Sequence, residues 1–483
     1  MTKPLFQRMK TWNTFHLQVS AMSSKENQIA AAGQRRENLL KALQNHAINI
    51  NSGGNPMAVI YTAPSYIRNN DVEHEYRPGS DMMYLTAFPE PSSILVLRPS
   101  ASDGEKAILF VRPKDPEREL WDGFRHGPQG ATETFNIDAA FDIAEFPKKL
   151  GELMKGHTSL WAKWGEFPNQ DAQLLACYHQ TRLRTRKSGI YPSVLGELSE
   201  VLHEQRQIKD EVEVAAMRQA GLISGNAFAN VMAATKPGLN EADIAAHMEY
   251  QFKRGGAQRS GYGAIVAGGS NACVLHYVSN NQPLKDGDLL LVDAGGEVDM
   301  YTADITRTWP VNGKFSPAQK DLYEIVLAAQ EASIAATVPG KSIKVVHEAS
   351  RSVLAQGLID LGVLKCSLAE ALGEEGDEPA KIPLHKYFMH GTSHWIGSDV
   401  HDVGRYFDGS VPRLFKPGMA ITVEPGLYIP TNDESVSADL RGIGIRIEDD
   451  ILVTASGNEV LTKTAPKTVA EVEAAVGSNP LDA

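Results

Sequence analysis

The chain has 483 residues, with 59 Asp and Glu against 47 Lys and Arg, so its formal net charge is -12. With 42% apolar and 22% charged residues, the composition is that of a soluble globular protein and excludes disorder over most of the chain. The acidic balance argues against a nucleic acid partner, which would require clustered Lys and Arg. At roughly 150 residues per domain, the length predicts two or three domains.

Cysteine use and hydropathy indicate an intracellular protein. Cys177, Cys273 and Cys366 are scattered and odd in number, which argues against a disulfide framework or a structural zinc site. No apolar run reaches the roughly 18 residues that span a bilayer. We therefore expect a cytoplasmic protein without a membrane partner. Residues 1–25 contain basic but no acidic residues, a composition shared with organelle transit peptides. Organelle targeting stays open, and the simpler interpretation is an unstructured extension.

The N-terminal half predicts an α/β domain. Residues 28–44 have apolar residues at helical spacing, and extended runs follow at 58–61, 93–97 and 107–111, separated by turns rich in Pro and Gly. This alternation is typical of a sheet covered by helices. A basic, polar stretch at 181–189 reads as a connection. We place the domain boundary near residue 204, with an N-terminal extension at 1–25, a first domain at 26–203 and a second at 204–483.

The second half predicts an irregular mixture of helices and paired strands. Ser316 and Ser342 precede two of the predicted helices as N-caps. Because strands occur in hairpin-like pairs, we expect an α+β arrangement and not a regular parallel series. Helices are predicted at 210–235, 241–254, 316–337 and 342–361, and strands at 261–268, 288–294, 300–311, 419–429 and 443–454.

Two carboxylates stand among apolar strand residues. Asp293 closes the run Leu290-Leu291-Val292, and Asp304 lies inside the next predicted strand. A Gly-containing turn between the two strands would bring both side by side. A carboxylate in an apolar strand is costly unless it is paired or bound to a cation. The two could equally be turn and cap residues, so the pair alone leaves metal binding at about even odds.

Three histidines, His390, His394 and His401, fall within twelve residues. The first two have the helical i, i+4 spacing of HExxH zinc sites, but the Glu is missing and Gly391 weakens a helix. One histidine could bind a metal while the others act on substrate. A single histidine here would be a satisfied core residue, but three so close together make that interpretation less favourable.

Two glutamates complete the candidate set. Glu424 stands in an apolar strand before Pro425, and Glu448 alternates with Ile445 and Ile447 on a face shared with Arg446. Each alone could belong to a salt-bridged sheet face. Together, four carboxylates and one imidazole suit manganese, cobalt or iron, and two divalent cations would neutralise them and activate a water between them. The full set is Asp293, Asp304, His394, Glu424 and Glu448.

These motifs, in this order, resemble the aminopeptidase P (Xaa-Pro aminopeptidase) members of the pita-bread metallopeptidases. The resemblance runs from about residue 28 to 475 and includes Asp71–Arg77, Val274–Tyr277 and Asn312–Phe315. It implies a creatinase-like N-terminal α/β domain followed by a pita-bread catalytic domain. The implied partners are peptides with proline at the second position. By analogy with the family, we expect a homo-oligomer, either a dimer or a tetramer.

The resemblance also implies the role of each site residue. Two manganese ions, with cobalt, iron or zinc as substitutes in vitro, would be bound by Asp293, by the bridging Asp304 and Glu448, and by His394 and Glu424. A hydroxide bridging the ions would attack the scissile carbonyl, with Glu424 as general base. His276 and His401 would contact the substrate carbonyl, His390 would position substrate beside the leaving proline, and Arg446 would orient the ligands.

Two alternatives remain. A prolidase would cut only Xaa-Pro dipeptides and would need a cation for the substrate carboxylate. The interval between the His401 motif and Pro417 is short, which favours aminopeptidase P, although Arg413 lies within it. A non-catalytic pita-bread binding protein would have lost metal ligands, whereas every ligand position is filled here.

Overall fold

The computed structural model describes residues 25–187, 189–374 and 376–479. The chain divides into two compact units, Ser23–Arg206 and Gln207–Ala483, which are described separately. The extension expected at 1–25 lies outside the described residues except for Lys25, which begins the first helix.

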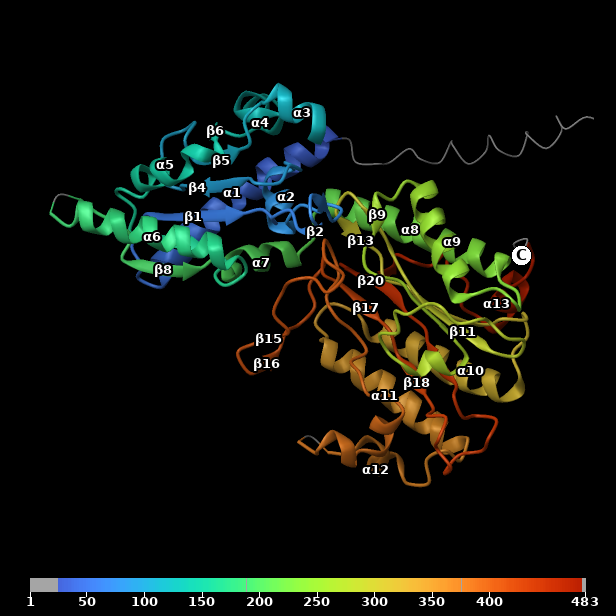
Figure 1. Ribbon diagram of the computed structural model, residues 1–483. Helices are drawn as coiled ribbons and strands as arrows, with labels where there is room; N and C mark the ends of the chain where they lie inside the picture. Colours follow the sequence, from blue (N-terminus) through green and yellow to red (C-terminus); the bar gives the residue numbers. More distant parts are fainter. Residues whose placement is uncertain (1–24, 188, 375, 480–483) are drawn as a thin grey trace, which may run out of the picture. The chain divides into compact units, whose positions relative to one another are not determined.

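The N-terminal unit is built on a six-stranded sheet in the order β6-β5-β4-β1-β7-β8 (Figure 1). The central strand β1 pairs antiparallel with β4 and parallel with β7. The β5–β6 and β7–β8 pairs are parallel, and β4–β5 is antiparallel. The strands are β1 (Pro56–Tyr61), β4 (Ile94–Leu97), β5 (Ala107–Val111), β6 (Ala139–Asp142), β7 (Ser159–Ala162) and β8 (Val194–Glu197).

Helices cover both faces of this sheet, so its central strands are apolar throughout. Along β1, Ala58 and Ile60 pack into one core and Met57 and Val59 into the other, as the alternation of side chains in a strand requires. The first core holds α1 (Lys25–Asn49), α2 (Ser80–Thr86), α4 (Gly127–Phe135) and α7 (Ser199–Gln207), and the second holds α5 (Phe146–Leu153) and α6 (Pro168–Thr185). Shorter elements are β2 (Ile67–Asn69), β3 (Val72–Glu73), α3 (Pro116–Asp122) and η2 (Ile143–Glu145).

A buried ion cluster joins α2 to α7. Arg206 Nη1 donates to Asp81 Oδ1 at 2.6 Å, and His203 Nε2 lies 3.3 Å from Asp81 Oδ2. Lys163 Nζ is 3.8 Å from the same oxygen. Burial alone would raise the pKa of Asp81, but the neighbouring cations outweigh it and hold the pKa well below its ordinary value of 3.8. The carboxylate therefore stabilises the folded N-terminal unit.

We predict that Asp81→Asn lowers the free energy of unfolding at pH 7 by roughly 3–5 kcal/mol, since it removes one member of a buried ion pair with Arg206. Because the folded-state pKa is depressed below 3.8, the Asp81 contribution is complete above about pH 4 and is lost as pH falls through the folded-state value. Urea unfolding at pH 7 and pH 3 should therefore show a smaller difference at the lower pH. The exposed Asp103 serves as control through Asp103→Asn, which should change little. An equal loss in both variants would contradict the prediction.

The C-terminal unit places its strands between two helical pairs, α8 with α9 and α10 with α11 (Figure 1). The pairs bury separate cores against the strands. Together with the N-terminal unit, this confirms the expected mixed α/β then α+β organisation. The helices are α8 (Glu211–Ala234), α9 (Glu241–Gly255), η3 (Gly269–Cys273), α10 (Pro317–Ala336), α11 (Ile343–Asp360), α12 (Leu368–Leu372), η4 (Pro379–Lys381), η5 (Pro383–Lys386) and α13 (Val469–Ala475).

The predicted N-caps have different outcomes. Ser316 accepts a hydrogen bond from the Gln319 N–H and forms a capping box with it. Ser342 occupies the cap position of α11, but its side chain makes no capping hydrogen bond, so that prediction is wrong in its chemistry. Asp210 caps α8 with Glu213 in a second capping box, which fixes where the helix begins.

Short antiparallel sheets converge between the helical pairs. In one of them β11 lies between β10 and β14, with Asp293 opposite Thr306. In another, β20 lies between β17 and β21. The two sheets are linked where the Glu448 N–H donates to the Thr306 carbonyl at 3.0 Å. The strands are β9 (Arg259–Ser260), β10 (Ile265–Gly268), β11 (Leu289–Asp293), β12 (Gly296–Val298), β13 (Tyr301–Thr302), β14 (Thr306–Pro310), β15 (Phe407–Asp408), β16 (Val411–Pro412), β17 (Ala420–Val423), β18 (Gly426–Tyr428), β19 (Gly444–Arg446), β20 (Asp449–Thr454) and β21 (Gly457–Val460).

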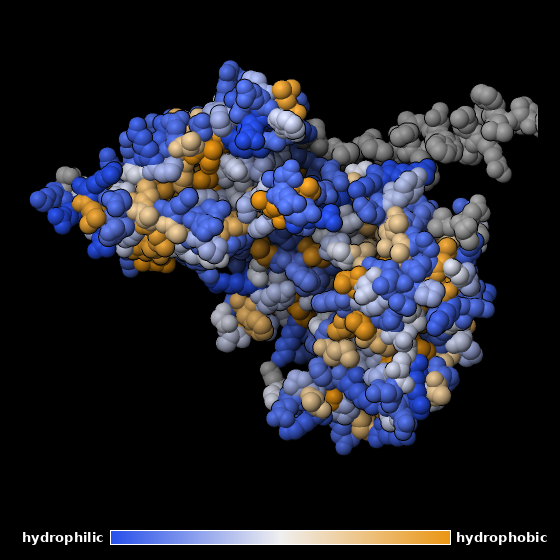
Figure 2. All heavy atoms as spheres, in the orientation of Figure 1, coloured by the Kyte–Doolittle hydropathy of each residue, from blue (hydrophilic) through white to orange (hydrophobic). Residues whose placement is uncertain are grey.

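The visible surface is predominantly hydrophilic, with scattered apolar residues (Figure 2). Among the residues that the structure describes, every helix is too short or too polar to cross a bilayer.

Candidate metal centre

All of the candidate site residues lie in the C-terminal unit, at strand ends and in loops. Asp293 ends β11, and Glu424 directly follows β17. Asp304 was expected inside a strand but lies between β13 and β14. Glu448 lies in the short step between β19 and β20. His276, His390, His394 and His401 occupy loops. The helical spacing of His390 and His394 is therefore coincidental, because Gly391 lies in a loop between η5 and β17.

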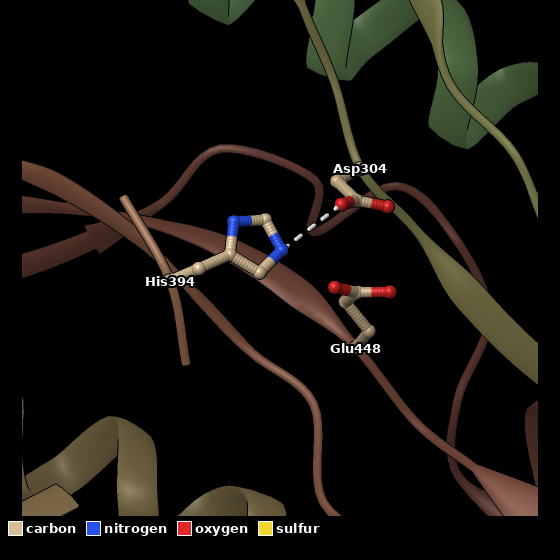
Figure 3. Close-up of side chains that lie close together, drawn as sticks. All are labelled: Asp304, His394 and Glu448. Carbon is tan, nitrogen blue, oxygen red and sulfur yellow. Dashed lines mark ion pairs between the residues drawn. The ribbon is translucent and has the colours of Figure 1, made fainter. Parts of the chain in front are cut away.

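Three side chains from distant parts of the chain form the centre of the site. One ligand atom each of Asp304, His394 and Glu448 lies within 4.8 Å of the others, and all three side chains point toward one another (Figure 3). Asp304 and Glu448 are buried, and His394 is half-buried. A carboxylate–imidazole set at this separation can hold a divalent cation among its donor atoms.

Asp293 lies beside this centre, joined to it through a tyrosine. The Tyr262 hydroxyl lies 2.7 Å from Asp293 Oδ1 and 2.5 Å from Asp304 Oδ1. A phenol has one proton, so it donates to one carboxylate at a time. Burial, followed by the charges of the two aspartates, raises the pKa of Tyr262 well above 10.0. The expected juxtaposition of Asp293 and Asp304 is therefore present.

Arg446 anchors the carboxylates from one side. Its Nη2 donates to Asp293 Oδ2 at 2.6 Å, and its Nη1 donates to the Tyr428 hydroxyl at 3.1 Å. Its Nε donates to Thr306 Oγ1 at 3.0 Å, and that hydroxyl in turn donates to Glu448 Oε2 at 2.6 Å. Arg446 thus pairs directly with Asp293 and reaches Glu448 through Thr306.

The imidazole of His394 is oriented for ligation. Its Nδ1 lies 3.0 Å from the Trp395 carbonyl, so this nitrogen carries the proton and donates. Its Nε2 lies 3.5 Å from Asp304 Oδ2 and 3.6 Å from Glu424 Oε1. A backbone acceptor on one ring nitrogen commonly fixes the other toward a metal. Burial would lower the pKa of His394, but the two carboxylates outweigh it and raise the pKa to about 9.

The other histidines surround this ring. The His401 ring packs edge-on against His394 with centroids 4.5 Å apart. His390 Nδ1 lies 2.8 Å from the Gly391 carbonyl, and its Nε2 lies 2.8 Å from the Tyr428 hydroxyl. Burial, followed by the charge of Arg446, lowers the pKa of His390 to about 3. His390 is therefore neutral at physiological pH. His276 is exposed and close enough to contribute to the lowered pKa of both neighbours.

The buried carboxylates repel one another strongly. Burial, followed by the charges of Asp304 and Glu424, raises the pKa of Glu448 well above 4.5. Burial likewise raises the pKa of Glu424 to about 7, although His394 and Arg446 oppose it. The positive charges beside the four carboxylates are those of Arg446 and His394. Two positive charges cannot balance four negative ones. The donor set and its excess negative charge therefore fit divalent cations.

A second layer of buried groups holds the segments that carry the proposed ligands. This layer was not predicted from the sequence. All the N–H groups of Arg307 are used: they donate to the carbonyls of Thr306, Glu448, Ala465 and Pro466 and to the Asp449 carboxylate. The Asp450 carboxylate accepts the Asp304 N–H at 3.0 Å. The sequence signal for this layer is the pair of acids after Glu448, Asp449 and Asp450. Tyr262 lies in a Gly-rich stretch, and nothing in that stretch indicates its contact with the two aspartates.

Comparison with known proteins identifies the class. Residues 215–455 match metallopeptidase family M24, and residues 32–161 match the aminopeptidase P N-terminal domain. The chain therefore belongs to the aminopeptidase P family of M24 pita-bread metallopeptidases, and it is an enzyme of the metal-dependent peptidase class. The expected family and fold are confirmed.

Individual relatives cover almost the whole chain. A curated Xaa-Pro aminopeptidase of Escherichia coli is 40% identical over 417 residues, 86% of this chain and 92% of the relative. The human Xaa-Pro aminopeptidase 3 is 36% identical over 91% of this chain and 84% of its own length. The solved structure of Pseudomonas aeruginosa aminopeptidase PepP superposes with a TM-score of 0.88 at 42% identity, over 93% of this chain and 98% of that one.

We predict that Glu448→Gln stabilises the metal-free protein and abolishes its stabilisation by Mn²⁺. The raised pKa of Glu448 means that its ionised form opposes folding at neutral pH, and the amide removes that charge. The same change removes a ligand, so the gain of RT ln(1 + [L]/Kd) on adding metal, about 2.7 kcal/mol at 100 Kd, should largely disappear. Thermal unfolding with a chelator and then with Mn²⁺ measures both effects.

The exposed Glu434 provides the control for this experiment, because Glu434→Gln removes the same charge away from the site. It should leave both the metal-free melting temperature and the Mn²⁺-induced rise near the wild-type values. A normal Mn²⁺-induced rise in the Glu448→Gln protein would show that Glu448 is not a ligand.

Proposed function

We propose that the chain is a manganese-dependent aminopeptidase that hydrolyses the bond between an N-terminal residue and a penultimate proline. The observation that carries the proposal is the convergence of carboxylates and an imidazole from distant segments, in a chain of this family. Relatives named Xaa-Pro aminopeptidase, 36–40% identical to it, support the substrate class. We also propose a cytoplasmic homo-oligomer, a dimer or a tetramer.

Two cations would be held by the five proposed ligands. Asp293 would bind one ion, His394 and Glu424 would bind the other, and Asp304 and Glu448 would be shared by both. A zinc-substituted form of the Escherichia coli enzyme has been solved with product, so related sites accept more than one metal. When bound, the ions would acidify the attacking water and polarise the scissile carbonyl.

Glu424 is suited to move the proton. Its carboxylate is 18% exposed and faces both His394 and His390. In the metal-free protein burial raises its pKa to about 7, and nearby cations would favour the ionised form that accepts a proton. It would accept a proton from the attacking water and pass it to the nitrogen of the leaving proline, which must be protonated before it departs.

The histidines would bind and orient the substrate. His276 and His401 would donate hydrogen bonds to the scissile carbonyl and stabilise the negative charge that develops on its oxygen. His390, held by Gly391 and Tyr428, would position the substrate beside the leaving proline. Arg446 would orient Asp293 and Tyr428 through its direct hydrogen bonds, and Glu448 through Thr306.

Proline in the second position explains why a dedicated enzyme is needed. The Xaa-Pro bond is a tertiary amide without an N–H, and the ring restricts the preceding residue to extended conformations. A peptidase that grips the scissile N–H cannot bind this bond. A pocket shaped for the ring would convert the same feature into specificity.

The decisive assay compares Xaa-Pro-Yaa, Xaa-Pro and Xaa-Ala-Yaa peptides in the presence of Mn²⁺. We expect cleavage of the tripeptide with proline, little cleavage of the alanine peptide, and loss of activity on chelation. Cleavage of the dipeptide alone would favour a prolidase. A protein that retains no metal after dialysis and hydrolyses none of the peptides with added Mn²⁺ would instead be a binding protein.

Asp304→Asn should abolish hydrolysis while leaving the fold largely intact. The amide has nearly the same volume but cannot supply the bridging negative charge. Peptide hydrolysis and far-UV circular dichroism measured on the same preparation test both parts. Turnover at the wild-type rate would overturn the ligand assignment.

A further inference from the structure

A buried glutamate outside the proposed metal site holds the segment that carries His276. Glu241, the first residue of α9, has no exposed surface. Its Oε1 accepts the Gly268 N–H at 2.8 Å and the Asn271 side-chain amide at 2.9 Å. Its Oε2 accepts the Tyr277 hydroxyl and the Gln282 N–H, each at 2.9 Å. One side chain thus fastens both ends and the middle of residues 268–282.

The backbone of the same residue adds to this anchor. The Glu241 N–H donates to the Gln282 carbonyl at 2.9 Å, and Asn240 Nδ2 donates to the Asn281 carbonyl at 3.1 Å. The N-terminus of α9 and the end of the segment are therefore joined in both directions. Within the segment, His276 and its neighbour Val278 are exposed, so the segment is held from its buried side and presents His276 on the other.

Only a carboxylate satisfies this arrangement. Four donors converge on two oxygens, and a carboxylate has about four lone-pair sites and no proton to place. A glutamine would set its NH₂ group against two of these donors, and in either orientation one of them is a backbone N–H, of Gly268 or of Gln282, which cannot accept. Burying an ionised carboxylate among neutral partners is costly. The cost is met here by four hydrogen bonds, each of the charge-assisted kind.

The segment faces the histidines of the candidate site. Within the segment, Cys273 Sγ donates to the Ile429 carbonyl at 3.4 Å. Ile429 directly follows Tyr428, whose hydroxyl lies 2.8 Å from His390 Nε2, so the segment packs beside the strand that holds His390. The segment begins at the end of β10 and continues through η3.

We propose that Glu241 is a positioning residue for hydrolysis: it holds residues 268–282 so that His276 faces the scissile carbonyl. This inference rests on the proposed role of His276. In this proposal Glu241, at the start of α9, influences the reaction through the four hydrogen bonds that it accepts. It does not contact the substrate.

The test is the Glu241→Gln variant, assayed with Xaa-Pro-Yaa and Mn²⁺. We expect kcat to fall about 10-fold or more, because a displacement of the order of 1 Å costs a catalytic group much of its effect. The amount of bound Mn²⁺ per chain should be unchanged. Glu249→Gln, on the exposed side of the same helix and paired with Lys253 in an i, i+4 ion pair, should keep wild-type kcat.

A double-mutant cycle with His276→Ala separates positioning from general damage. If Glu241 acts through His276, Glu241→Gln should cost little further kcat once His276 has been removed. If Glu241→Gln lowers kcat by the same factor with and without His276, the proposal is overturned. Tyr277→Phe, which removes one donor from Glu241, provides a milder variant for the same cycle if Glu241→Gln folds poorly. A wild-type protein that fails to cleave the peptide would refute the proposed function itself, which is a distinct result.

Discussion

The structure of the C-terminal unit depends on keeping several carboxylates together in a buried place. Their mutual repulsion and desolvation raise the pKa of Glu448 and of Glu424, and the surrounding residues are arranged to oppose this. Arg446 pairs with Asp293, Tyr262 joins the two aspartates, and Arg307 ties together the backbones beside Thr306 and Glu448. This frame leaves the site with excess negative charge, which a bound metal ion in this metal-dependent peptidase family would offset.

The fold and the proposed ligand set could be predicted from the sequence because the motifs that carry the family resemblance are local. A carboxylate that interrupts an apolar strand, such as Asp293 or Glu424, contradicts its surroundings and therefore stands out. Capping patterns such as Ser316 with Gln319 fixed helix starts in the same way. The backbone conformation at Asp304 and Glu448 was harder to predict, because both lie in short connections between strands. The ends of those strands are set by pairing with neighbouring strands.

The supporting residues were not predictable, because their meaning arises only from tertiary contacts. Tyr262 stands 31 positions from Asp293 and 42 from Asp304, and nothing in its Gly-rich stretch distinguishes it from a turn residue. Glu241 looks like an acid that complements a helix dipole, although the four hydrogen bonds that its carboxylate accepts come from residues outside the helix. Ser342 shows the opposite case, in which the local signal was right for the position and wrong for the chemistry.

The wide spacing of the ligand segments has a consequence for what bound metal would stabilise. Arg446 and Asp293 are 153 positions apart, and Thr306 and Glu448 are 142 apart. A metal ion bound by ligands on these segments would cross-link a long loop of the chain. Closing such a loop costs conformational entropy, and the cost grows with loop length. Because these segments lie so far apart along the chain, the site is complete only after they have packed against each other. Metal bound there would therefore stabilise the packed C-terminal unit as a whole and not one local turn.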